Sequence, residues 1–141
     1  MKILAVDLGK ARTGLAICDE GEVLATPAGV ISEWNREKLL RDVAEESEKL
    51  GAEQIVVGLP KNMDGSEGDS AQSARAFAES LRTLVSIPVA MQDERGTTIT
   101  AHNYLNDTDT RGKKRKAVID AVAATVILQD YLAWRRNHPN A

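Results

Sequence analysis

An apolar run of four residues near the start of the chain, Ile3–Val6, constrains the fold more than any other feature. A run without polar alternation is typical of a strand that is buried on both faces in the middle of a sheet. Asp7 follows at the end of this strand, where a carboxylate is costly to desolvate unless it meets a cation or several donors. Gly9 and Gly14 flank the next turn and leave room for another backbone or a ligand. The stretch predicts a functional carboxylate at Asp7 or, more simply, an aspartate that caps a hairpin turn.

Length and composition limit the classes of protein that this chain can form. With 141 residues, 43% hydrophobic and 28% charged, it is expected to fold as one domain over residues 1–137, followed by a tail at 138–141. One cysteine and two histidines exclude an internal disulfide and the usual structural zinc site. The sequence contains neither a signal-peptide pattern nor an apolar run long enough to span a bilayer, so we expect a cytoplasmic protein.

Apolar runs, turn signals and helical spacing predict nine elements along the chain. Strands are expected at 3–6, 13–18, 23–31 (broken near Pro27), 55–59 and 87–91, and helices at about 39–50, 74–85, 97–105 and 114–136. Ser32 or Asn35 is expected to cap the first helix, and Asp69 or Ser70 the second. Trp34 is expected to be a packing anchor rather than a platform for a base. The buried stripe of the last helix is predicted to comprise Val118, Ala121, Val122, Thr125, Leu128 and Leu132.

The order of these elements indicates a fold class. Three consecutive strands joined by short turns form an antiparallel meander, and a strand that follows a helix indicates a crossover to a parallel neighbour. We therefore predict an α/β protein of the RNase H-like fold. Its five-stranded mixed sheet would combine the three-strand meander with two parallel strands, flanked by helices.

Acidic residues follow two of the strands that are predicted to be parallel. Asp7 ends the first strand, and Asp93 and Glu94 end the fifth, so their side chains should emerge at one edge of the sheet. Asp120, about two turns into the last helix, would join them if that helix packs across this edge. An acidic cluster without histidine or cysteine favours Mg²⁺ or Mn²⁺ and the chemistry of phosphodiester cleavage. Alternatively, Asp120 pairs with Lys116 one turn earlier, and Glu94 forms a salt bridge near Arg95.

A basic run precedes the last helix, although the formal net charge of the chain is −3. Residues 111–116 contain five cations in six positions. Such a local patch can bind phosphates on an acidic protein, or it can be a solvated charged loop.

Four motifs in a fixed order resemble the YqgF family, also called RuvX. The first is Asp7-Leu8-Gly9 with Arg12–Ala16, and the second is the long and unusual segment Val57–Gly68. The third is Asp93-Glu94-Arg95 with Thr97-Thr98. The last begins at Lys114–Lys116 and continues through Asp120, Ala123-Ala124 and Ile127–Leu132. Together they span nearly the whole chain.

The resemblance implies a metal-dependent nuclease of the RNase H-like fold that matures the 5′ end of pre-16S ribosomal RNA. It implies Asp7, Glu94 and Asp120 as the catalytic and metal-binding acids, with Asp93 as a further metal ligand and Mg²⁺ or Mn²⁺ as the cofactor. The resemblance implies structured nucleic acid as the partner, pre-rRNA before branched DNA, and the precursor of the small ribosomal subunit as a further partner. The implied nucleic-acid-binding residues are Lys10, Arg12, Lys61, Asn62, Arg95, Lys113, Lys114, Arg115 and Lys116.

Two positions depart from what this fold and family lead us to expect. The fourth strand has Gly58 where nucleases of this fold offer an acid, so the third ligand must come from the fifth strand. The longer side chain of Glu94 makes it a better candidate than Asp93. Gly96 replaces the bulky apolar residue that usually follows the Asp-Glu-Arg motif, which loosens the turn that aims Glu94.

Three other functions are compatible with parts of the pattern. A resolvase for four-way DNA junctions would share the fold and the metal chemistry. A nucleic-acid-binding ribosome assembly factor that does not cut would fit the overall acidity and the missing acid at Gly58. An actin-like or sugar-kinase phosphotransferase also begins with a strand and Asp-x-Gly, but it needs two such domains, and this chain has room for one.

Overall fold

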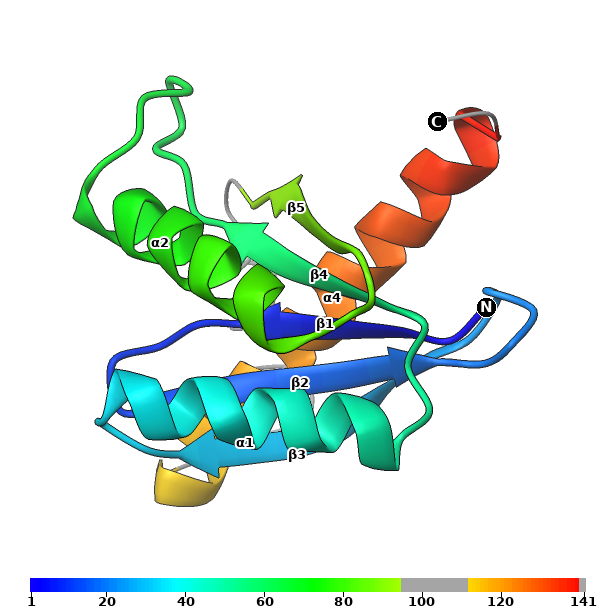
Figure 1. Ribbon diagram of the computed structural model, residues 1–141. Helices are drawn as coiled ribbons and strands as arrows, with labels where there is room; N and C mark the ends of the chain where they lie inside the picture. Colours follow the sequence, from blue (N-terminus) through cyan, green and yellow to red (C-terminus); the bar gives the residue numbers. More distant parts are fainter. Residues whose placement is uncertain (95–111, 140–141) are drawn as a thin grey trace.

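Five strands form one mixed sheet, as the sequence predicts, and their order is β3-β2-β1-β4-β5 (Figure 1). The computed structural model describes residues 1–94 and 112–139, with the backbone alone for residues 112–119; residues 95–111 and 140–141 lie outside the description. The expected short helix at 97–105 therefore falls outside the described residues. The strands are β1 (Ile3–Asp7), β2 (Arg12–Cys18), β3 (Ala25–Ser32), β4 (Gln54–Leu59) and β5 (Val89–Asp93).

The pairing of the strands confirms the meander and the two crossovers. β1 pairs antiparallel with β2, and β2 antiparallel with β3. β4 lies parallel to both β1 and β5. The predicted break near Pro27 is a register shift in the β2–β3 pair, between Leu15 and Ala16. Because β1, β3, β4 and β5 all run toward the same edge, the loops that follow them gather there.

Helices cover both faces of the sheet (Figure 1). Helices α1 (Arg36–Lys49) and α2 (Asp69–Leu84) lie on one face, and α4 (Gly112–Asn137) crosses the other. Alternation along β1 separates two cores: Leu4 and Val6 pack with α1 and α2, whereas Ile3 and Ala5 pack with α4. By the same alternation Asp7 belongs to the face that α4 covers.

Helix boundaries agree with the sequence signals in one case and differ in another. Asn35 caps α1, as predicted, and its side chain accepts a hydrogen bond from the Lys38 amide at 3.0 Å. The prediction for α2 was wrong, because Gly68 occupies the cap position and Asp69 is already in the first turn. There its carboxylate lies near the positive end of the helix dipole.

Four further predictions about packing and strand limits were wrong. Strand β3 begins at Ala25, and Val23 is exposed in the preceding turn. Strand β5 begins at Val89 rather than Ile87, because Pro88 has no amide hydrogen and joins the sheet only through its carbonyl. Trp34 is 73% exposed and anchors no core. Leu128 and Leu132 of the predicted α4 stripe are buried, but the buried face is otherwise rotated and comprises Ala123, Ala124, Ile127, Leu128, Tyr131 and Leu132; the side chain of Val118 lies outside the description.

None of the helices in the described part of the chain combines the length and the apolar content needed to cross a membrane.

Candidate active site

Asp7 lies at the end of β1, between the sheet and α4, with little of its carboxyl group open to water. Burial raises its pKa from 3.8 to about 7, and the nearby charge of Asp120 acts in the same direction. A carboxyl with a pKa near neutrality costs free energy to ionise in this place. It therefore favours a counter-ion, which is the behaviour expected of a ligand for a cation.

Asp120 reaches this site because α4 packs unusually closely against β2. A Cβ atom on Gly14 would lie 2.0 Å from the backbone oxygen of Asp120, so only glycine permits this approach. The Asp120 carboxylate accepts a hydrogen bond from Nε of Arg12 at 2.8 Å. The described partner of Asp120 is thus a residue of β2, and the side chain of Lys116, the alternative partner, is not described.

Glu94 follows β5 directly and is buried against the same face. Its amide donates to the carbonyl of Leu59 at 2.9 Å, which continues the β4–β5 pairing by one residue. Burial raises the pKa of Glu94 to about 9, and the charges of Asp130, Asp7 and Asp93 add to this effect in that order. Asp7 and Glu94 are therefore close enough to influence each other across β4.

Gly58 explains how Glu94 takes this position. A Cβ atom on Gly58 would lie 3.1 Å from Cγ of Glu94 and 2.6 Å from Cδ1 of Ile127. The space above Gly58, where an acid of the fourth strand would begin, is filled by the Glu94 side chain and by α4. Asp93 points elsewhere: its side chain is 41% exposed and lies 3.9 Å from Nζ of Lys61. Of the two candidates left open by the sequence, Glu94 is the one that lies beside Asp7.

Asp130 is an acid near the site that the sequence reasoning did not single out. Among the neighbouring charges, that of Asp130 raises the pKa of Glu94 the most, and burial raises the pKa of Asp130 itself. The sequence signal that could have pointed to Asp130 is its place within the Ile127–Leu132 motif, ten residues after Asp120 on the same helix. The effect of its charge on Glu94 depends on how α4 crosses the sheet, which no local pattern reveals.

The donor set fits a hard divalent cation. All the side chains gathered here are carboxylates, and Mg²⁺ prefers oxygen ligands, keeps several waters and needs only one or two carboxylates from the protein. Within the described residues, no three or more acidic, histidine or cysteine side chains are grouped so that together they could hold a metal ion. The Arg12 guanidinium meanwhile engages Asp120.

The predicted nucleic-acid-binding residues divide into two groups. Lys10 lies in the turn after β1, Arg12 begins β2, and Lys61 and Asn62 follow β4, so all four are at the edge where Asp7 ends its strand. Asn62 stabilises its own loop through hydrogen bonds to Ser66 at 2.9 Å. Arg95 lies outside the described residues, and for Lys113, Lys114, Arg115 and Lys116 only the helical backbone is described.

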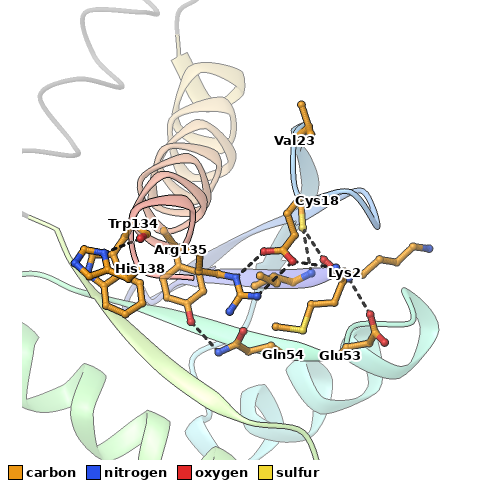
Figure 2. A network of polar contacts seen from close by, with 12 residues as sticks. Lys2, Cys18, Val23, Glu53, Gln54, Trp134, Arg135 and His138 are labelled. Atoms are coloured by element: carbon orange, nitrogen blue, oxygen red, sulfur yellow. Dashed lines mark hydrogen bonds and ion pairs between the residues drawn. The ribbon is translucent and has the colours of Figure 1, made fainter. Parts of the chain in front are cut away.

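A second set of contacts fixes the other end of α4. Arg135 donates to Glu22 at 2.5 Å, and the same carboxylate binds the amino group of Met1 at 3.1 Å. Figure 2 shows this network together with Gln54, whose side-chain amide donates to the hydroxyl of Tyr131 at 2.8 Å. Because α4 is held here and at Gly14, the positions of its two acids relative to the sheet are set at both ends.

Comparison with known proteins identifies the family. The profile of the RuvX family, described as Holliday junction resolvase, matches residues 1–134. The chain belongs to this family.

Relatives and solved structures agree with this assignment. A protein of Chloroflexus aurantiacus named "Putative pre-16S rRNA nuclease" is 40% identical over 138 residues, covering 98% of this chain and 90% of that protein. A protein of the same name from Anaeromyxobacter sp. is 42% identical over 135 residues, covering 96% and 98%. Thermus thermophilus RuvC matches with a TM-score of 0.58 at 14% identity, covering 97% of both chains. The fowlpox virus Holliday junction resolvase matches with a TM-score of 0.57 at 13% identity, covering 95% and 99%. These structures confirm the RNase H-like fold of the RuvX chain.

Proposed function

We propose that this RuvX protein is a metal-dependent endonuclease that processes the 5′ end of pre-16S rRNA. The observation that supports the proposal is the position of Asp7, whose pKa is raised by burial and by the charge of Asp120 on α4, and whose own charge adds to burial in raising the pKa of Glu94 after β5. Burial makes ionisation of Asp7 and Glu94 unfavourable. A site that concentrates such carboxyls gains free energy when a divalent cation binds and protons leave.

Asp7, Glu94 and Asp120 would hold the cation, and Asp93 remains a further candidate. When bound, Mg²⁺ or Mn²⁺ supplies positive charge that polarises the phosphodiester and eases deprotonation of the attacking water. Asp7 and Glu94 lie at the ends of rigid strands, which hold their carboxylates in place. These side chains therefore need little further ordering when the reaction takes place.

The cationic residues at the same edge would bind the sugar–phosphate backbone. Lys10 and Lys61 come from the loops after β1 and β4, Arg12 begins β2, and the neutral amide of Asn62 lies next to Lys61; Arg95 with the 113–116 run would extend the surface. Phosphate contacts of this kind position a strand without reading its sequence. A protein with a role in ribosomal RNA maturation would act in the cytoplasm.

The names of the relatives support pre-16S rRNA as the substrate. The family description and the match to T. thermophilus RuvC in complex with a Holliday junction substrate, with a TM-score of 0.61, support a second candidate, cleavage of four-way DNA junctions. Both reactions would use the same acids on a phosphodiester.

The two candidates are tested by incubating the protein with a 5′-extended small-subunit rRNA precursor and with a four-way DNA junction. Each substrate is tested with Mg²⁺, with Mn²⁺ and with chelator, using wild type, Asp7→Asn and Asp42→Asn. Asp42 is an aspartate of α1, on the opposite face of the sheet, and controls for loss of one negative charge. We expect metal-dependent cleavage of the RNA that Asp7→Asn abolishes and Asp42→Asn preserves.

Preferential cutting of the junction would replace the first candidate by the second. Cleavage that survives Asp7→Asn would refute the assignment of the site. Binding without cleavage under every metal condition would favour a ribosome assembly factor that does not cut.

A further inference from the structure

Trp34 stands exposed at the edge of the sheet that carries the candidate active site. It lies in the short connection between β3 and α1, and 73% of its surface is accessible. An indole that contributes nothing to a core leaves a large apolar face in water. At this edge of the sheet, the exposed face of the indole is placed where a nucleic acid bound at the candidate active site could meet it.

The connection that carries Trp34 is held firmly to the turn after Asp7. The amide of Glu33 donates to the carbonyl of Ala11 at 3.0 Å, which continues the β2–β3 pairing beyond Ser32. On the other side of Trp34, Nη1 of Arg36 donates to the carbonyl of Gly9 at 3.1 Å. These two contacts attach the residues on both sides of Trp34 to residues 9–11. The backbone that carries Trp34 is therefore already ordered before a ligand binds.

Three cationic residues lie close to this connection in the sequence or in the adjoining turn, and the acids Glu33 and Glu37 lie among them. Lys10 is exposed in the same turn, Arg36 begins α1, and Lys38 neutralises Glu33 at 3.0 Å. Gly9, Lys10 and Arg36 also border a hollow of about 380 Å³, whose other lining residues include Ser70 and the acid Asp69. An aromatic ring among cations is the usual arrangement for binding single-stranded nucleic acid, because the ring stacks on a base while cations follow the phosphates.

The sheet register places Trp34 within reach of a strand that passes Asp7. Asp7 pairs with Gly14, and Arg12 pairs with Ser32 of β3, two strands away from β1. The usual spacing between strands puts β3 roughly 10 Å from Asp7 across the sheet. Along the strand direction, Trp34 lies roughly 13 Å beyond the level of Asp7. A base on Trp34 would therefore lie a few nucleotides from the phosphodiester at Asp7.

We propose that Trp34 is a stacking platform for an unpaired nucleobase of the strand that lies across the edge of the sheet at Asp7. The proposal specifies an unpaired base because such a base can leave the stack of its neighbours and place its face against an aromatic side chain. The proposal rests on nucleic-acid binding at this edge, as in the proposed function, and it adds the residue and the chemical group that it recognises.

Binding and fluorescence test the platform in an Asp7→Asn background, which keeps the nucleic acid intact. The probes are a single-stranded oligoadenylate of about twelve nucleotides, the same strand with abasic sugars, and an oligoadenylate–oligouridylate duplex; the length is within known single-strand site sizes. Trp134→Phe leaves Trp34 as the sole tryptophan of the two in the chain. Trp34→Ala removes the ring and Trp34→Phe keeps a smaller one. Val23→Ala is a matched control, because Val23 is 75% exposed and lies at the opposite end of the strands.

We expect the single strand to quench Trp34 fluorescence, whereas the abasic strand and the duplex do not. Trp34→Ala should weaken binding of the single strand about 5- to 150-fold, the range that corresponds to one stacked base. Trp34→Phe should recover part of this loss. Trp34→Ala should leave affinity for the abasic strand unchanged, and Val23→Ala should leave every affinity unchanged.

Equal binding of the single strand by wild type and Trp34→Ala would overturn the platform, as would absence of binding or of quenching. An equal loss for the abasic strand would also overturn it, because the effect would then be electrostatic or structural. These failures are distinct from failure of the proposed function: cleavage by the wild type in the metal assay would stand even if Trp34 proved irrelevant.

Discussion

Replacing Asp7 by asparagine should stabilise the metal-free protein at alkaline pH, although it should abolish cleavage. The reason is the raised pKa of Asp7, from 3.8 to about 7. Below the lower value both the folded and the unfolded chain carry the proton, so the group has no effect. Between the two values only the folded chain keeps its proton, and stability falls as the pH rises. Above about pH 7 the cost is complete.

The size of the effect follows from the shift. Each pKa unit corresponds to 1.36 kcal/mol, so ionised Asp7 lowers the free energy of unfolding by at most about 4 kcal/mol. Part of Asp7 remains accessible to solvent, which makes this figure an upper limit. For a chain of 141 residues, each kcal/mol moves the melting temperature by roughly 2–4 °C. The neutral amide avoids this penalty, and the expected gain at about pH 8 is up to roughly 8–16 °C.

The assay is thermal unfolding in chelator at about pH 4 and about pH 8, with Asp42→Asn as the control for a lost charge. Asp7→Asn should melt above wild type at the higher pH and close to it at the lower. Adding Mg²⁺ or Mn²⁺ at the higher pH should then raise the melting temperature of wild type but not of Asp7→Asn, because only the carboxylate binds the ion. A destabilisation by Asp7→Asn that is equal at both pH values would refute the reasoning.

Three further substitutions test the contacts that assemble the site. Gly14→Ala would put a methyl group 2.0 Å from the backbone oxygen of Asp120, so chemical denaturation should show a loss of about 1–3 kcal/mol or more; unchanged stability would contradict the close approach. Gly58→Ala would press on Glu94 and should lower cleavage far more than stability, whereas equal activity would mean that the Glu94 position is not critical. Arg12→Gln should raise Mn²⁺ affinity in calorimetry, because Asp120 loses its competing cation, and should weaken RNA binding. If Mn²⁺ affinity instead stays constant, Arg12 does not compete with the ion.

Much of the fold could be predicted from the sequence because its signals are local. The unbroken apolar run of β1 indicates a central strand, and the cap at Asn35 marks the start of α1. The order of strands and helices then leaves few topologies, because crossovers are right-handed and consecutive elements lie close together. Acids placed after parallel strands could be expected at one edge for the same reason, which is how Asp7 and Glu94 were found.

The tertiary structure decided what depends on the placement of α4 and on contacts between distant residues. Apolar residues occur on all sides of α4, so periodicity could not determine which face is buried. The partner of Asp120 is Arg12, 108 residues away in sequence, and the acid beside Glu94 is Asp130. Trp34 could not be assigned from its local pattern either, because exposure depends on what packs over a residue. Strand and helix patterns arise between neighbours in the chain, whereas the geometry of the site arises from rigid elements brought together by Gly14 and Gly58.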